Sequence, residues 1–124
     1  MDNKALLQVG GQKIELRIVE GMQELGTYDH DSKIICINES LKDDDKEFFS
    51  TVRHELMHAS LAISGVSFGM SEQVEEQVVR CFDGVFFPAY EAMINDALKW
   101  ATKQPRKRPK AKADKPQRKR GKKA

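Results

Sequence analysis

The sequence has few cysteines and no long apolar run, and both shortages narrow what the protein can be. Only two cysteines, Cys36 and Cys81, occur in 124 residues, too few and too far apart for the disulfide framework of a small secreted protein. No run of about 18 apolar residues is present, and the first residues lack the charged-then-apolar order of a signal peptide. We therefore expect a cytoplasmic protein with no membrane partner, in which both cysteines are small buried apolar residues.

Charge is distributed unevenly along the chain, although the net charge is only +2. Residues 101–124 contain twelve of the 21 Lys and Arg residues and a single acid, so the remaining body is strongly acidic. This tail also has three prolines and no aliphatic residue larger than alanine, too little apolar surface to offset the entropy of folding. We expect one folded domain over residues 1–100 and a disordered basic tail over residues 101–124. Residues 103–123 are either an arm for nucleic acid or a solubilising segment that can fold back on the acidic body.

Apolar patterning in the first hundred residues predicts an α+β fold. Alternation around a Gly-Gly break indicates a β-hairpin over residues 5–19, and a turn at residues 29–32 precedes a strand in the segment KIICIN. We expect three or four strands in a small, mostly antiparallel sheet, packed on a helix from 43–45 to 64. Further helices are expected from 71 to a kink or break at Pro88, and from 90 to about 99. The helix from 71 should carry these residues on one apolar face: Val74, Val78, Cys81, Phe82 and Val85.

The first predicted helix contains the sequence His54-Glu55-Leu56-Met57-His58. Residues i and i+4 lie one turn apart on the same helix face, so two imidazoles can bind one metal ion. The glutamate between them projects at a neighbouring angle, from which it can take a proton from a water molecule that the metal activates. The pattern is typical of zinc peptidases, so it predicts Zn²⁺ on His54 and His58 with Glu55 as general base. The alternative is a pair of helix-surface histidines that binds no metal.

A catalytic zinc ion needs a third protein ligand, and no histidine follows His58. The candidates are the acids of the next predicted helix, in the segment SEQVEEQ. A chain that reverses after the first helix brings roughly residues 75–78 opposite the histidines, and Glu75 flanks the apolar face predicted for that helix. Glu75 is therefore the predicted third ligand, and Glu72 and Glu76 are the alternatives. Two other candidates lie too far along the helix to be preferred: Cys81 and Asp83.

The chain from roughly residue 26 to residue 88 resembles the ImmA/IrrE family of small bacterial and phage metallopeptidases. The resemblance is carried by a GTYD turn, a strand like KIICIN, the helix TVRHELMHASLAISG, a glutamate-rich helix EEQVVRCF and a proline shortly after it. It implies a zincin-like metallopeptidase domain. In such a domain His54, His58 and a glutamate that maps best onto Glu75 would hold zinc, with Glu55 as the general base.

The sequence departs from the pattern of that family just beyond the predicted third ligand. Val78 and Val79 stand where small and polar residues are usual in the family, so the group that would support Glu75 from one turn beyond is missing. If Glu72 were the ligand instead, Glu76 would fill that supporting position. The sequence therefore leaves the choice of ligand open.

Together the motif and the resemblance predict a zinc-dependent metallopeptidase that acts on a protein or peptide substrate, for example a DNA-bound regulator. An extended substrate could pair with KIICIN, taken as an edge strand, or with its neighbour. Four side chains are candidates for stabilising the oxyanion that forms on the substrate: Tyr28, His30, Arg53 and Tyr90.

Other functions fit parts of the sequence. A nucleic-acid-associated binding module with a structural or vestigial zinc site would explain the basic tail, but the body cannot easily assemble four Cys or His ligands. A DNA-protein-crosslink protease of the SprT kind would need a third histidine ligand. Hydrolysis of a non-peptide amide would use the same zinc chemistry.

Overall fold

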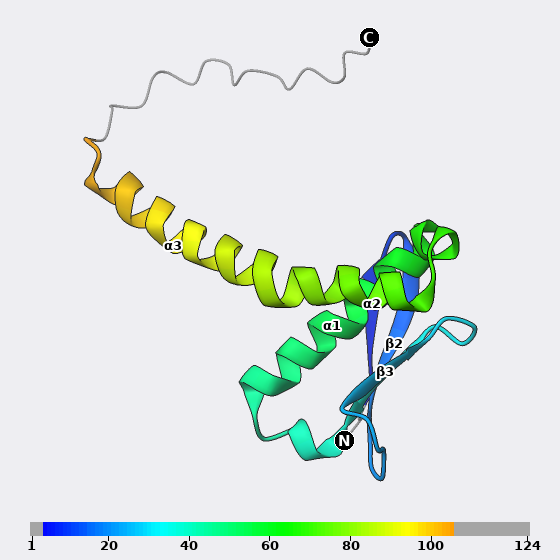
Figure 1. Cartoon of the computed structure of the whole chain (residues 1–124). Helices are drawn as coiled ribbons and strands as arrows, with labels where there is room; N and C mark the ends of the chain where they lie inside the picture. The colour runs from blue at the N-terminus through cyan, green and yellow to red at the C-terminus, as the bar shows by residue number, and fades with distance from the viewer. Residues whose placement is uncertain (1–3, 106–124) are drawn as a thin grey trace. The chain divides into compact units, whose positions relative to one another are not determined.

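The computed structural model describes residues 4–105 and has the α+β fold that the sequence predicts, with a four-stranded sheet followed by helices (Figure 1). Short 3₁₀-helices at Glu39–Leu41 and Val66–Gly69 flank the first long helix, and a π-helix occupies Phe82–Phe86. The strands are β1 (Lys4–Val9), β2 (Gln12–Val19), β3 (Gly26–Asp29) and β4 (Ile34–Asn38). The α-helices are α1 (Asp45–Ile63), α2 (Glu72–Cys81) and α3 (Phe87–Lys103).

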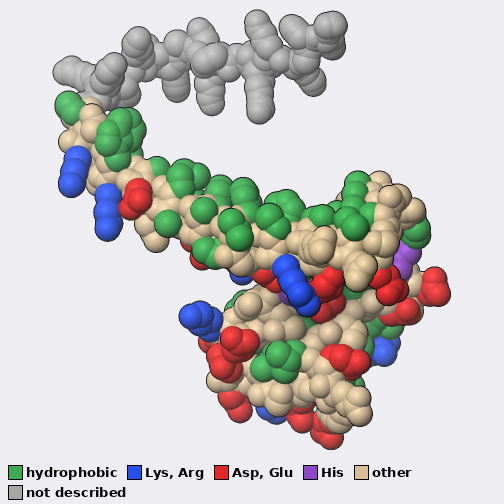
Figure 2. Space-filling view, viewed as in Figure 1, with side chains coloured by type: hydrophobic (Ala, Val, Ile, Leu, Met, Phe, Trp, Pro, Cys, Tyr) green, Lys and Arg blue, Asp and Glu red, His purple; other side chains and the backbone are tan. Residues whose placement is uncertain are grey.

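The chain divides into two units, with the boundary after Ala89. The first unit holds the sheet, α1 and α2, and most of α3 belongs to the second. Residues 101–103 are helical rather than part of a disordered tail, because α3 continues to Lys103; the rest of the predicted tail, from residue 106, lies outside the described residues. Figure 2 shows hydrophobic side chains at the surface along α3. The exposed residues of this helix include Met93, Leu98 and Trp100. Within residues 4–105, no helix combines the length and the apolar character needed to cross a membrane.

The sheet has the strand order β1-β2-β4-β3 and is mostly antiparallel, as expected. β1 pairs with β2 and β3 pairs with β4 in antiparallel fashion, whereas β2 and β4 run parallel. The segment KIICIN is therefore a central strand, not an edge, and its neighbour β3 forms one edge of the described sheet. Burial explains the central place of β4, because Ile35 and Ile37 are fully buried and a central strand covered on its apolar face favours such residues.

The core lies between the sheet and α1. Ile14, Ile35 and Ile37 of the sheet pack with Val52 and Ala59 of α1, and all five are buried. Each large aliphatic side chain contributes about 1.5–3 kcal/mol on burial. This packing fixes α1 against β3 and β4, so the face of α1 that carries the histidines is held at the edge of the sheet.

The helix ends follow from local sequence. The Asp44 side chain accepts a hydrogen bond from the Glu47 N–H at 3.2 Å and caps α1, and Gly65 just beyond the helix has a φ of +86°, which favours glycine. The Ser71 hydroxyl accepts from the Val74 N–H at 3.2 Å and caps α2. These caps set the length of the reversal that brings α2 back alongside α1.

Pro88 does not break the helical region, because the α-helix α2 ends before it at Cys81 and helical structure continues through residue 88. After Cys81 the helix widens into the π-helix Phe82–Phe86, in which the Phe87 N–H bonds to the Phe82 carbonyl five residues earlier. α3 then begins at Phe87, so Pro88 lies in its first turn. A proline there is tolerated, because the N–H that it lacks would have no intrahelical partner at a helix start.

The inward face of α2 also differs from the predicted one. Val79 is fully buried, whereas Val74 and Phe82 are 44% and 39% exposed and Val85 in the π-helix is 66% exposed. The cysteines are not buried either, since Cys36 is half-buried and Cys81 is exposed. For α2 the physical reason is that its inward face carries Glu75 and Glu76, which contact the histidines of α1, with Val79 as its buried apolar residue.

Candidate metal centre

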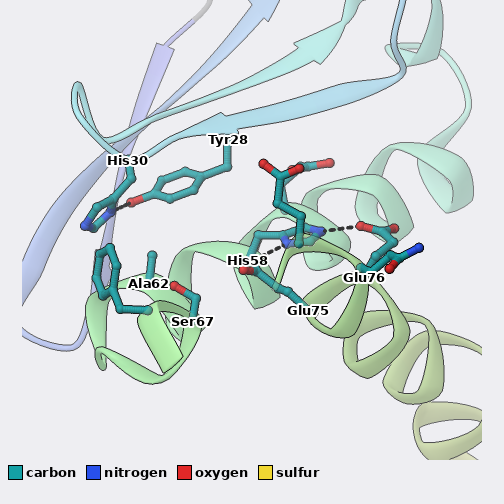
Figure 3. Close-up of a pocket in the computed structure, with 11 residues that line it drawn as sticks. Tyr28, His30, His58, Ala62, Ser67, Glu75 and Glu76 are labelled. Atoms are coloured by element: carbon teal, nitrogen blue, oxygen red, sulfur yellow. Dashed lines mark hydrogen bonds and ion pairs between the residues drawn. The ribbon is translucent and has the colours of Figure 1, made fainter. Parts of the chain in front are cut away.

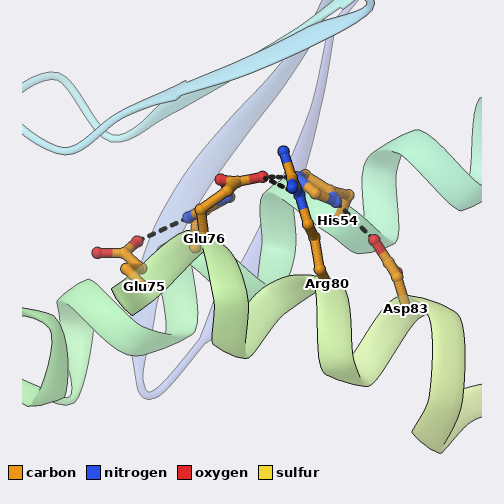
Figure 4. Close-up of polar contacts among 6 residues, drawn as sticks. His54, Glu75, Glu76, Arg80 and Asp83 are labelled. Carbon is orange, nitrogen blue, oxygen red and sulfur yellow. Dashed lines mark hydrogen bonds and ion pairs between the residues drawn. The ribbon is translucent and has the colours of Figure 1, made fainter. Parts of the chain in front are cut away.

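Three side chains from α1 and α2 form a group that could hold a metal ion: His54, His58 and Glu76. One ligand atom from each lies within 4.8 Å of the others. The Glu76 carboxylate lies 3.6 Å from His54 Nε2 and 3.2 Å from His58 Nε2, and Figure 4 shows it reaching toward His54 between the two helices. Two imidazoles and one carboxylate are a donor set that suits catalytic zinc, which leaves a fourth position for water.

The other nitrogen of each imidazole contacts a second carboxylate. Asp83 Oδ2 lies 2.5 Å from His54 Nδ1, and Glu75 Oε2 lies 2.6 Å from His58 Nδ1. A carboxylate accepts, so each Nδ1 donates its proton in these contacts, and each Nε2, which faces Glu76, is the nitrogen that could bind a metal ion. Metal-binding histidines in proteins are usually oriented in this way. The two pairs therefore support the metal-binding tautomer of both rings.

The predicted third ligand, Glu75, is not in the group of three, and Glu76, named as an alternative, takes that place. Glu75 instead holds His58 from the outer side (Figure 3). From the sequence, the inward face of this helix is predicted to be the one with Val74, Val78 and Phe82. In the structure Val79 faces inward, and at about 100° per residue this turns Glu76 as well as Glu75 toward α1.

Asp83, which the sequence does not favour as a ligand, contacts the candidate metal group through His54. It lies in the π-helix between α2 and α3, and besides His54 it faces Arg53, whose Nε is 3.7 Å from Asp83 Oδ1. The Arg53 guanidinium in turn lies 4.4 Å from the centroid of the Phe87 ring. π-helical turns occur often at functional sites. The sequence does contain a signal for this contact, because Asp83 lies two helical turns beyond Glu76 and therefore on the same helix face.

Glu55 is the only charged side chain among the buried residues of the described chain, with 8% exposure. Burial raises the pKa of Glu55, and Glu76 and Asp83 add to that shift, whereas His54 and His58 oppose it. A buried carboxylate between two imidazoles is poorly solvated and hence a stronger base than one in water. This environment suits a group that accepts and returns a proton.

The group opens into a cavity of about 710 Å³. Glu55, His58, Glu75 and Glu76 border it on the helix side, and Tyr28 and His30 border it on the side of the sheet (Figure 3). Of the four candidates for oxyanion stabilisation, the structure thus brings Tyr28 and His30 to the cavity. Arg53 is engaged with Asp83 instead, and Tyr90 belongs to the second unit.

A smaller cavity of about 360 Å³ lies on the other side of Glu55. Gly26 and Leu25 line it together with Ser50, Thr51, His54, Glu55 and Asp83. Glu55 lines both cavities, and strand β3 borders both, with Gly26 at the smaller one and Tyr28 at the larger. The two cavities therefore lie one after the other along the edge strand β3, with the candidate metal-binding group between them.

We expect the substitution Asp83→Ala to weaken metal binding about 10- to 100-fold, because His54 would lose the carboxylate that fixes its Nδ1 proton. Competition for Zn²⁺ with a chromophoric chelator measures the dissociation constant. Asp43→Ala is the matched control, since Asp43 is an exposed acid in the turn before α1, away from the histidines. Equal zinc affinity of the two variants would show that the contact between Asp83 and His54 does not support the metal.

No protein-family model, no curated protein and no solved structure matches this chain.

Proposed function

We propose that the protein is a zinc-dependent peptidase, of the kind found in the ImmA/IrrE family that its sequence resembles. The observation that carries the proposal is the position of strand β3, which runs past Glu55 from one cavity to the other. A peptide chain is the substrate that such a site suits, because it can lie along a strand with side chains in a cavity on each side of the bond to be cleaved.

The outer edge of β3 offers main-chain groups for this pairing. Among the described strands β3 pairs only with β4, so its other edge has no strand partner. An extended peptide can add to such an edge through backbone hydrogen bonds, which recognise the main chain rather than particular side chains. The sheet would thus hold the peptide bond beside α1 without help from a loop.

His54, His58 and Glu76 would hold the metal, and Asp83 and Glu75 would keep both rings in the correct tautomer and orientation. A bound zinc ion lowers the pKa of water to around 7 and polarises a carbonyl group. Glu55 would accept the proton of the attacking water and pass it to the leaving amine. Its burial and its position between the two histidines support this role.

Hydrolysis of peptides by the metal-loaded protein tests the proposal. We expect the zinc-loaded full-length chain to cleave members of a mixed peptide library. Mass spectrometry of the new peptide termini detects the cleavage. Cleavage should stop with a chelator and return when zinc is restored. The absence of cleavage after loading with Zn²⁺, Mn²⁺ or Co²⁺ would contradict the proposal, since these ions all accept imidazole and carboxylate ligands.

Three statements stay predictions from the sequence. They are nucleic-acid binding by residues 103–123, a DNA-bound regulator as substrate, and a cytoplasmic location. The structure describes the chain only as far as residue 105, so most of the basic segment lies outside it.

A further inference from the structure

The side chains that line the larger cavity carry an excess of negative charge. Four carboxylates line it, and there is no Lys or Arg among the described residues of its lining. Two of the four, Glu75 and Glu76, are paired with the histidines, and a third, Glu55, is buried beside them. The fourth, Glu72, is exposed in the first turn of α2, where no ion pair or hydrogen bond links it to another described side chain.

A bound divalent ion would not cancel this charge. Four carboxylates carry four negative charges, and the ion supplies two positive ones. The nearest cation on α2 is Arg80, 3.8 Å from Glu76, but Arg80 is not part of the lining and its side chain is 75% exposed (Figure 4). The cavity therefore stays negative when the metal is bound.

The side of the cavity opposite the glutamates is aromatic. The rings of Tyr28 and His30 have centroids 5.8 Å apart, and His30 and Phe68 are also 5.8 Å apart. A hydrogen bond of 2.8 Å between the Tyr28 hydroxyl and His30 Nδ1 holds the first two in place (Figure 3). A row of rings can receive the aliphatic stem of a long side chain and attract its cationic end.

We infer that the larger cavity binds a lysine or arginine side chain of the substrate, at a residue next to the bond that is cleaved. This inference rests on the peptidase function proposed above. The stem would lie against Tyr28, His30 and Phe68, and the cationic group would face Glu72. An acidic side chain would meet four carboxylates, and a purely apolar one would leave Glu72 facing it without compensation.

The smaller cavity explains why the preference is one-sided. Its volume is about 360 Å³ against about 710 Å³ for the larger one, and two carboxylates line it rather than four. One of the two, Asp83, is already paired with His54 and Arg53. It suits a shorter or uncharged side chain on the other side of the cleaved bond. The substrate class is thus a peptide with one basic residue at the cleavage point, rather than a run of basic residues.

A set of peptides that differ at one position tests this inference with the zinc-loaded full-length protein. The variable residue is Lys, Arg, norleucine, Gln or Glu, in a sequence otherwise free of charge, and mass spectrometry identifies the cleaved bond. We expect cleavage next to the variable residue, with kcat/KM for Lys or Arg at least about tenfold above norleucine and lowest for Glu. Glu72→Gln should narrow the preference for Lys over norleucine about fivefold, whereas the matched control Glu47→Gln, at the far end of α1, should keep it.

The outcomes separate the two proposals. Cleavage with equal kcat/KM for Lys, norleucine and Glu would overturn the inference and leave the peptidase function intact. A Lys preference that Glu72→Gln does not change would overturn the role of Glu72 facing the cationic group. No cleavage of any peptide would overturn both the inference and the function on which it rests.

Discussion

The variant Glu76→Ala is expected to lose zinc affinity by more than about 100-fold, because it removes one of three protein ligands rather than a group that supports a ligand. Among the described residues, the carboxylate of Glu76 is the only one within 3.6 Å of the Nε2 atoms of both histidines. Without it two imidazoles remain, four residues apart on α1, and no other carboxylate of the described residues lies close to both Nε2 atoms. Zinc content by plasma mass spectrometry, after dialysis against a weak chelator, measures the loss.

The neighbouring glutamates provide the matched controls for this result. Glu75→Ala should lower the affinity only about 10- to 100-fold, since it removes the group that orients His58. Glu72→Ala should leave the zinc content at one ion per chain, because Glu72 has no contact with either histidine. Loss of zinc in Glu75→Ala together with its retention in Glu76→Ala would reverse the assignment and restore the ligand that the sequence predicts.

The variant Glu55→Gln is expected to keep its zinc and to lose about 10²- to 10⁴-fold in kcat/KM. Glutamine has the shape of glutamate, so the packing of this buried position of α1 against β3 is preserved. It cannot accept the proton of the attacking water, which is the role that burial between the two histidines supports. The loss should appear in kcat rather than in KM, because the proton transfer belongs to the chemical step.

Zinc content and hydrolysis must be measured on the same preparation of Glu55→Gln. The full zinc content separates a lost base from a lost metal, and the exposed variant Glu47→Gln controls for removal of one negative charge. Activity of Glu55→Gln within about threefold of the wild type would remove Glu55 from the mechanism, and the water would then need another base.

Much of the fold follows from the sequence because local signals agree there. The alternation around Gly10-Gly11 gives the β1–β2 hairpin, and the two helices begin where the sequence predicts, with Asp44 capping α1 and Ser71 capping α2. His54, Glu55 and His58 share one helix face for a reason that depends only on the geometry of an α-helix. Their position needed no knowledge of the rest of the chain.

The third ligand could not be fixed in the same way. It depends on how α2 is rotated against α1, and a rotation of about 100° exchanges Glu75 for Glu76. Apolar patterning, which usually indicates the inward face, is misleading here because α2 faces a polar site and leaves Val74 exposed. The inward face of α2 and the π-helix carries Glu72, Glu76, Val79 and Asp83 at helical spacing. The sequence indicates this face only if carboxylates, rather than apolar residues, are expected to point inward.

The central position of β4 in the sheet could not be predicted from the sequence for a different reason. Its pairing with β2 is parallel, and a parallel pair joins segments that are distant in the chain. The sequence between them shows a turn and a short strand, which fit a simple antiparallel meander equally well. Likewise the π-helix before Pro88 has no sequence signal beyond the proline itself, whose missing N–H is accommodated at the start of α3.

Gly26 connects the stability of the fold with the shape of the site. A Cβ atom at this position would lie 2.7 Å from Thr51 Cγ2 and 3.2 Å from Glu55 Cγ, so any side chain would push α1 away from β3. The smaller cavity is lined by this same residue. A side chain at residue 26 could not narrow that cavity from the strand side without also displacing Glu55. If the protein is the peptidase proposed here, new cleavage preferences would have to evolve through Leu25 or Ser50, while residue 26 stays glycine.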